Sequence, residues 1–411
     1  MIYFDHSATT PVDKKVLDKM LPYFNKNFGN PSSIHNFGQI AIAGVDKARK
    51  QISNFLNCEP EEVVFTSGAT ESNNLAIFGF LKAFLKNSKN KKKPHFISSI
   101  IEHDAVIEPF MELESRGYKV TYLKTQKNGV IDIEEFRKAI QDNTALVSLM
   151  YLNSEVGSIQ PIREVGKIIK KINAKRLTEW KKMRVRDRGA RPDPIYFHSD
   201  ATQALNFLNC DIKYLHLDMM SFSAHKIYGP KGVGALFVKK GTPLAPAQLG
   251  GHHENNRRSG TINSSGIVGF GEAVDLLNGV QEKTNQKIAK LRKKLVDGII
   301  KNIPDAHLNT DIDNASPAHA HFSFAGAEGE AVLVNLDMEG IAVSTGSACA
   351  SSSHKASRVL IAMGIPVELA HSSIRFSLGK NNTLADIQKL IKVLPPIIKR
   401  IRKMNPIYEN K

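Results

Sequence analysis

The sequence is short of cysteine and tryptophan and contains no long apolar run. Its three cysteines are Cys58, Cys210 and Cys349, and no Cys-x-x-Cys or Cys/His spacing accompanies them. A disulfide framework and a metal site are therefore not expected, and a reducing cytoplasm is the expected location. No apolar stretch approaches the roughly 18 residues that a membrane helix needs, so no membrane association is expected. The amino terminus reaches Asp5 without a preceding apolar run, so we expect no signal peptide.

Acidic residues are also scarce relative to basic ones. The 56 Lys and Arg exceed the 40 Asp and Glu, which leaves a net charge of +16. Clustered positive charge binds phosphates by releasing counterions, so nucleic-acid binding is one function class to consider. Much of the excess lies in residues 167–191, where eleven Lys and Arg face only Glu179 and Asp187, without the pattern of a recognition helix. A solvated loop is the simpler interpretation of this segment and of the lysine cluster 89–93.

The length suits one large domain and one smaller domain. From about residue 63, short β-branched or aromatic runs alternate with longer helical stretches. This alternation is typical of a mostly parallel sheet covered by helices, an open α/β domain. The expected strands are residues 63–66, 96–101, 120–123, 146–152, 195–198, 219–222 and 235–238.

A second domain is expected after about residue 262. The pattern there predicts a long amphipathic helix over 266–302, a strand over 320–324 and a final helix over 383–402, which together indicate an α+β domain. We place the boundary near Ser259-Gly260-Thr261. The predicted division is a large domain of residues 13–262 and a small domain of residues 1–12 and 263–411.

The segments that follow the expected strands are rich in polar and reactive side chains. Ligands of open α/β sheets bind beyond the carboxyl ends of the strands, so these segments are the place to look for a site. Ser67-Gly68-Ala69-Thr70 follows a strand and opens a helix, where backbone N–H groups can hold a phosphate. Thr70 as a simple helix cap is the alternative. The other segments are Glu102-His103, Asn153, Asp200-Ala201-Thr202-Gln203 and Ser223-Ala224-His225-Lys226.

Lys226 and Asp200 form the most informative pair. Lys226 follows a strand and precedes a glycine-rich turn, so its amine can enter the cleft and form a Schiff base. A buried carboxylate such as Asp200, paired with a pyridine nitrogen, is what pyridoxal phosphate needs to act as an electron sink. Taken alone, a surface lysine and a helix-capping aspartate are the alternatives.

Five segments occur in a fixed order: Thr66–Ser72, Asp200–Gln203, Ser221–Lys226, Arg258–Thr261 and Gly346–Cys349. Together they resemble the cysteine desulfurases of the IscS/NifS class, within the class-V aminotransferases. The similarity extends beyond them, from Asp5–Pro11 to Arg375–Gly379. It implies an aspartate-aminotransferase-like large domain of pyridoxal-phosphate fold type I and a smaller α+β domain that carries the cysteine loop.

The resemblance implies an enzyme that converts L-cysteine to L-alanine and transfers the sulfur to Cys349 as a persulfide. The sulfur would then supply acceptor proteins, such as an iron-sulfur scaffold, or tRNA thiolation. Small polar residues around Cys349, at 344–353, suit an exposed loop, a setting that Cys58 and Cys210 lack. Pyridoxal 5'-phosphate as cofactor and a homodimer are further implications.

The resemblance also assigns roles around the cofactor. Lys226 would bind its aldehyde, Asp200 its ring nitrogen and Gln203 its ring hydroxyl. His103 would stack on the ring and take part in proton transfer. The phosphate would be held by Ala69, Thr70, Ser223 and His225, with Thr261 reaching it from the other subunit.

The substrate carboxylate would be bound by Arg375, whose planar fork suits bidentate pairing. Asn153 and Ser154 would lie near the substrate. The family usually has Asn-Asn-Glu where this chain has Asn153-Ser154-Glu155, so a shorter hydroxyl replaces an amide. The chain also has an insertion before Ile195 that contains its only tryptophan, Trp180.

Two alternatives remain open from the sequence. Selenocysteine lyase, or another pyridoxal-phosphate enzyme of the same fold, would share Lys226 and Asp200 without requiring Cys349. A protein that binds nucleic acid through residues 167–191 is the alternative from a different functional class.

Overall fold

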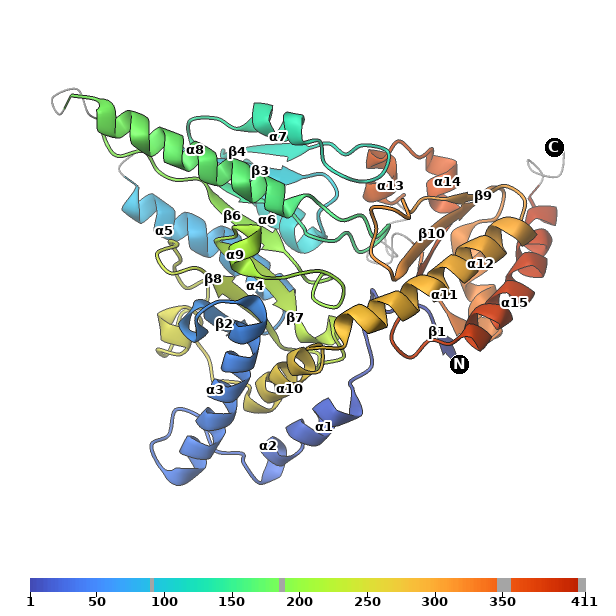
Figure 1. The fold of residues 1–411 in the computed structure, drawn as a ribbon, viewed down its shortest axis with the longest axis horizontal. Coiled ribbons are helices and arrows are strands. Elements are labelled where there is room, and N and C mark those ends of the chain that lie inside the picture. The colour runs from blue at the N-terminus through green and yellow to red at the C-terminus, as the bar shows by residue number, and fades with distance from the viewer. Residues whose placement is uncertain (89–91, 185–188, 346–355, 406–411) are drawn as a thin grey trace.

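The computed structural model describes residues 1–88, 92–184, 189–345 and 356–405. Figure 1 shows a large region built around one sheet and a smaller region around α11 and α15. In the described ranges, no helix is long and apolar enough to cross a membrane.

A seven-stranded sheet with the order β2-β8-β7-β6-β5-β3-β4 forms the centre of the large region. Only β8 runs antiparallel to its neighbours, so the other strands end at the same edge. All seven predicted strands are present. β5 ends at Ser148, four residues before its predicted end, and every other strand end lies within two residues of the prediction. Their bounds are β2 Val63–Thr66, β3 His95–Ser99, β4 Lys119–Leu123, β5 Thr144–Ser148, β6 Tyr196–Asp200, β7 Met219–Ser223 and β8 Gly234–Val238.

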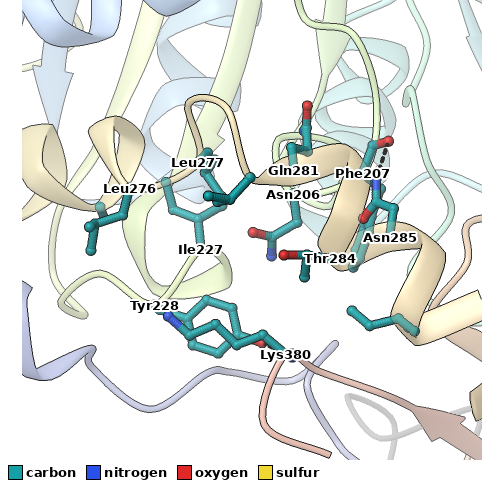
Figure 2. Close-up of a pocket in the computed structure, with 13 residues that line it drawn as sticks. Asn206, Phe207, Ile227, Tyr228, Leu276, Leu277, Gln281, Thr284, Asn285 and Lys380 are labelled. Atoms are coloured by element: carbon teal, nitrogen blue, oxygen red, sulfur yellow. Dashed lines mark hydrogen bonds between the residues drawn. The ribbon is translucent and has the colours of Figure 1, made fainter.

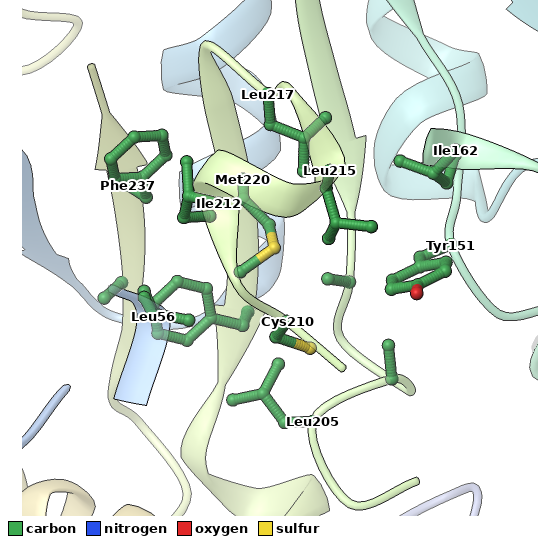
Figure 3. Packing of buried hydrophobic residues seen from close by; sticks show 14 of the residues in the cluster. Leu56, Tyr151, Ile162, Leu205, Cys210, Ile212, Leu215, Leu217, Met220 and Phe237 are labelled. Carbon is green, nitrogen blue, oxygen red and sulfur yellow. The ribbon is translucent and has the colours of Figure 1, made fainter. Parts of the chain in front are cut away.

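Helices cover both faces of this sheet, as buried parallel strands require. Successive strand residues point to opposite faces, so Met219 and Met220 join different hydrophobic clusters. The cluster with Met220 includes Phe237 and Leu56 (Figure 3). The helices and helical turns of this region are α1 Lys14–Met20, α2 Pro22–Asn25, α3 Asn36–Leu56, η1 Pro60–Glu62, α4 Ala69–Asn74, η2 Leu75–Gly79, α5 Phe80–Asn87, α6 Asp104–Ser115, α7 Ile133–Ala139, α8 Ile162–Lys182, α9 Ile212–Leu215, η4 Ala224–Lys226 and η5 Glu254–Asn256.

The basic segment is largely helical, which corrects the expectation of a loop. α8 extends to Lys182, and its buried residues all precede Lys170. Figure 1 shows its final turns extending away from the sheet. The indole Nε1 of Trp180 donates to the carbonyl oxygen of Gly189 at 3.0 Å. Residues 185–188, and residues 89–91 of the lysine cluster, lie outside the described ranges.

The predicted helix over 266–302 is wrong as one element, because it is two helices, α10 Ser264–Asp275 and α11 Gln281–Asn302. Gly279 lies between them with φ of +73°, a left-handed conformation that interrupts a helix and favours glycine. α10 packs against α3 within the same hydrophobic cluster. The domain division at residue 262 stays a prediction.

The smaller region contains a three-stranded sheet with the order β12-β10-β9 and a short pair, β1-β11. The predicted strand over 320–324 and the predicted helix over 383–402 are both confirmed. Phe4, Phe322 and Leu390 share the hydrophobic cluster of this region. The bounds are β1 Ile2–Tyr3, β9 Ala306–Leu308, β10 His319–Phe324, α12 Gly329–Met338, β11 Ile341–Ala342, α13 Arg358–Ala362, α14 Val367–His371, β12 Ser373–Ser377 and α15 Leu384–Lys403.

Candidate active site

Lys226 ends the helical turn η4, directly after β7. Its ammonium Nζ donates to the carbonyl oxygens of Ser7 and Ala8, at 2.5 and 2.7 Å. The Ser7 hydroxyl in turn contacts Nε2 of His319 at 2.8 Å. The half-buried Lys226 is therefore held by the amino-terminal segment and is not an ordinary surface lysine.

Asp200 is the last residue of β6, next to β7 in the sheet, and it is 7% exposed. Its Oδ1 accepts from the Thr202 amide at 2.9 Å, and its Oδ2 accepts from the Asn73 side chain at 2.7 Å. Turns follow Asp200, so the alternative of a helix-capping aspartate is wrong. Both donors are neutral, which leaves the carboxylate suited to a cationic N–H group.

Two polar atoms beside this carboxylate suggest that a polar ligand fits here. Oδ1 of Asn73 and Oγ1 of Thr202 are buried and have no hydrogen-bond partner in the described part of the chain. Buried polar atoms are normally paired, so such atoms need an explanation. The donor set around Asp200 therefore fits a protonated pyridine ring of pyridoxal phosphate.

The segment after β2 opens a helix, as the predicted phosphate site requires. α4 begins at Ala69, and its cap is Gly68, which has φ of +157° and no side chain to occupy the first N–H groups. Thr70 lies inside this helix, so the alternative of Thr70 as the cap is wrong. A Cβ on Gly234 would lie 2.7 Å from Cα of Gly68, so glycine at 234 allows β8 to approach the loop closely. Exposed N–H groups at a helix start suit a phosphate.

The other predicted cofactor residues lie around the same edge of the sheet. Nδ1 of His225 contacts the Thr9 hydroxyl at 3.1 Å. Burial, with Lys226 and Lys231 nearby, lowers the pKa of His225 to about 4, so the ring is neutral at pH 7. The Gln203 amide donates to the Ser7 carbonyl at 2.9 Å. Ser223 is buried, whereas Thr261 is exposed and lines a hollow with Ser67.

His103 caps the start of α6, beyond the end of β3. Its Nδ1 accepts from the Ala105 amide at 3.1 Å, which places the proton of a neutral ring on Nε2. The imidazole is exposed and lines an open hollow together with Thr70. The fold thus brings two of the predicted site residues, His103 and Thr70, to one depression.

Arg375, on β12, is 5% exposed. It donates to Oδ1 of Asp5 at 2.8 Å and to the carbonyl of Ser154 at 3.0 Å, while its buried Nε has no partner within the described ranges. Ser154 therefore contributes a backbone oxygen to this cluster. The Asn153 side chain accepts from the amides of Glu155 and Val156, so it holds the turn after β5. The substrate roles of these three predicted residues stay predictions.

Cys349 lies outside the described residues. The other two cysteines are poor nucleophiles, because burial raises the pKa of Cys58 and of Cys210 to about 12. Figure 3 shows Cys210 between Leu205 and Met220 in the hydrophobic core.

A small, partly open pocket of about 50 Å³ lies beside the lysine turn. Figure 2 shows Asn206, Tyr228 and Lys380 among its lining residues. The Asn206 amide donates to the carbonyl oxygen of Lys226 at 2.6 Å. None of the predicted site residues lines this pocket, so it is distinct from the candidate site.

Sequence reasoning missed three groups that complete the site: Asn73, the backbone of Ser7, and Asp5. Asn73 lies three residues after Thr70 on one helix, and this spacing could have indicated a shared face. Asp5 and Ser7 belong to the amino-terminal segment that carries the family resemblance, but nothing in the sequence pairs them with Arg375 or Lys226.

Comparisons with known proteins agree with this geometry. The family model described as aminotransferase class-V matches residues 2–179 and 186–390, and the break falls within the predicted insertion. A relative from Clostridium botulinum (strain Hall), named cysteine desulfurase IscS, is 43% identical and covers 100% of this chain and 97% of its own. A relative of the same name from Methanosarcina thermophila is 43% identical and covers 99% and 94%.

Solved structures give the same result. One described as a NifS-like protein has a TM-score of 0.84 at 34% identity and covers 98% of both chains. Another, described as SspA in complex with cysteine, has a TM-score of 0.78 at 34% identity and covers 93% of this chain and 100% of its own. The fold class expected from the motifs is confirmed. The chain therefore belongs to the class-V aminotransferase family, among its cysteine desulfurases.

Proposed function

We propose that this protein is a pyridoxal-phosphate-dependent cysteine desulfurase that converts L-cysteine to L-alanine and carries the sulfur on Cys349 as a persulfide. The observation that carries the proposal is the placement of Asp200 and Lys226 at the ends of adjacent strands, β6 and β7. One aligned structure is described as a complex with cysteine, which supports this substrate over other amino acids.

The residues suited to hold the cofactor surround that pair. Asp200, supported by Asn73, would hold the ring nitrogen, and Gln203 the ring hydroxyl. The start of α4 with Ala69 and Thr70, together with Ser223 and His225, would hold the phosphate, and Thr261 would reach it from a second subunit. When bound, pyridoxal phosphate supplies an electron sink for bond cleavage at the substrate's carbon atoms.

The chain's own side chains move the protons and bind the substrate. Lys226 must leave the carbonyls of Ser7 and Ala8 and lose its extra proton, after which the neutral amine can accept the α-proton of the substrate. Arg375 can hold the substrate carboxylate with the N–H groups that its pairing with Asp5 leaves available. The Cys349 thiolate attacks the substrate sulfur, the carbon-sulfur bond breaks, and the released carbon takes up a proton to give alanine.

A homodimer is part of the proposal. Large apolar side chains are exposed together on α1 to α3 and the turn between α2 and α3: Leu21 is 52% exposed, Phe24 62% and Ile34 95%. Exposed apolar clusters of this kind mark interaction surfaces, and a second copy would cover them. Analytical ultracentrifugation tests the dimer.

We further propose a cytoplasmic location and transfer of sulfur to acceptor proteins such as an iron-sulfur scaffold.

Incubation with L-cysteine and pyridoxal phosphate tests the activity, with alanine and sulfide measured in the presence and absence of a thiol reductant. We expect equal alanine and sulfide with reductant, and sulfur retained on the protein without it. Lys226→Ala should abolish both products. Cys349→Ser should still bind the cofactor but release no sulfur from cysteine. Turnover of selenocysteine but not cysteine, or full activity of Cys349→Ser, would favour selenocysteine lyase instead.

A further inference from the structure

Arg358 is attached to the loop that presents His103, although more than 250 residues separate the two in sequence. Its guanidinium donates to the carbonyl oxygen of Ile100 at 3.1 Å and to that of Glu102 at 2.8 Å. It also pairs with Oδ1 of Asp104 at 2.8 Å. One side chain therefore contacts residues on both sides of His103.

These contacts fix the backbone on both sides of His103 and so influence the orientation of its imidazole ring. The Glu102 carbonyl is part of the peptide bond that precedes His103, and Asp104 is the residue that follows His103. A planar guanidinium fixes several acceptors at once, which a lysine amine cannot do. The ion pair with Asp104 is exposed and contributes little by itself, so the two carbonyl contacts matter most. With the loop held, Nδ1 of His103 stays on the Ala105 amide and Nε2 carries the proton.

The helix that carries Arg358 is itself anchored to the large region. The hydroxyl of Ser357, the cap of α13, donates to Oε2 of Glu155 at 2.5 Å. Leu360 and Val359 pack in a buried cluster with Ile101 and Met150, from the loops that follow β3 and β5. The backbone at Arg358 is therefore fixed, so its side-chain contacts can hold the loop that contains His103 in one position.

We propose that Arg358 is a positioning residue, which holds the backbone on both sides of His103 so that the imidazole presents an Nε2 proton to the substrate. This inference rests on the proposed function. It makes His103 a proton donor in its resting orientation, because Nδ1 is already occupied as an acceptor. Misplacement of a reacting group by about 1 Å costs about 100-fold in rate.

The test compares kcat and KM for L-cysteine in Arg358→Ala, Arg358→Lys and a control, Arg116→Ala. The control removes an exposed arginine that pairs with Glu112 on the same helix α6. Arg358→Ala should lower kcat about 10- to 100-fold with KM nearly unchanged. Arg358→Lys should recover only part of the loss, and Arg116→Ala should match the wild type. Equal kcat in Arg358→Ala and wild type would overturn the proposal, whereas an inactive wild type would overturn the proposed function.

A double-mutant cycle with His103→Ala separates positioning from general destabilisation. If Arg358 acts through the imidazole, Arg358→Ala should cause no further loss of single-turnover alanine formation in the His103→Ala background. An equal loss in both backgrounds would show that Arg358 acts elsewhere. Nitrogen NMR of the His103 ring is a measurement that does not depend on enzyme activity. It should show only the Nε2–H tautomer in the wild type and a mixture of the two ring tautomers in Arg358→Ala. If Arg358→Ala does not fold, Arg358→Lys carries the same cycle and the same spectrum.

Discussion

Glu102 is a buried carboxyl group next to the exposed His103. It is 1% exposed, and its Oε1 accepts from the Ser99 hydroxyl at 2.6 Å and from the Met150 amide at 2.8 Å. Burial raises the pKa of Glu102 to about 8, and the charge of Asp200 adds to the effect. Glu102 is therefore mostly neutral at pH 7, and its proton is part of the folded structure.

The proton held by Glu102 predicts a difference in the pH dependence of stability between the wild type and Glu102→Gln. The folded state binds the proton more tightly than the unfolded chain, whose carboxyl has the ordinary pKa of 4.5. The wild type should therefore lose stability as the pH rises from about 4.5 to about 8, and the amide variant should lack this loss. The measurement is urea unfolding of both proteins at pH 5 and at pH 8.5. The free energy of unfolding of Glu102→Gln minus that of the wild type should be about 1 to 3 kcal/mol larger at pH 8.5 than at pH 5. A constant difference between the two proteins would mean that Glu102 is ionised throughout.

A second prediction at the scale of single residues concerns Asn73 and the affinity for the cofactor. Its amide is the only side-chain donor to Asp200 among the described residues, and a hydrogen bond to a charged group contributes about 1.5 to 3 kcal/mol. Asn73→Ala should therefore weaken binding of pyridoxal phosphate about 10-fold or more, measured by titrating the apoprotein. Asn309→Ala is the matched control, because it removes an amide with two side-chain contacts in the small sheet. Equal affinities in the two variants would remove Asn73 from the cofactor site.

At the scale of elements, the break between α10 and α11 depends on Gly279. Its φ of +73° is left-handed, and a Cβ added at this position would meet no atom within 4 Å. Gly279→Ala should therefore lower the free energy of unfolding by about 1 to 2 kcal/mol through backbone strain alone. Gly189→Ala, where a Cβ would also meet no atom within 4 Å and the backbone is not left-handed, should be nearly neutral in the same urea titration. A neutral Gly279→Ala would show that the connection relaxes.

The elements that could be predicted well from the sequence are those with local causes. The β-branched or aromatic runs that end in polar segments predicted β2 and β7, and the parallel arrangement then placed Asp200 and Lys226 at one edge. The helix break could not be predicted, because the apolar period of α10 resumes in α11 after a short interval. The charge of the basic segment favours a solvated loop, but its Lys, Arg and Glu residues also favour a helix. The contacts of Asn73, Ser7 and Arg358 join residues distant in sequence, so no local pattern predicts them.

At the scale of the whole molecule, α8 carries eight Lys and Arg against two Glu, and its last turns extend from the body (Figure 1). No residue from Lys170 to Lys182 is buried, and Lys175, Lys181 and Lys182 are all exposed to solvent. The proposed chemistry uses none of them. We therefore expect Lys175, Lys181 and Lys182, all changed to Gln together, to leave kcat/KM for L-cysteine unchanged with a small reductant.

The same triple variant tests whether the position of the charge matters beyond the net charge of +16. The matched control changes Lys283, Lys290 and Lys294 on α11 to Gln, because these lysines are also exposed and the loss of charge is identical. A polyanion gains affinity by releasing counterions from the cations that it can reach, and the last turns of α8 project from the body whereas α11 lies along the smaller region (Figure 1). The α8 variant should therefore elute from a heparin column at lower salt than the α11 variant, because screening by salt releases the more weakly bound protein first. Identical elution of the two variants would mean that α8 is a solvated projection with no preference for anionic partners.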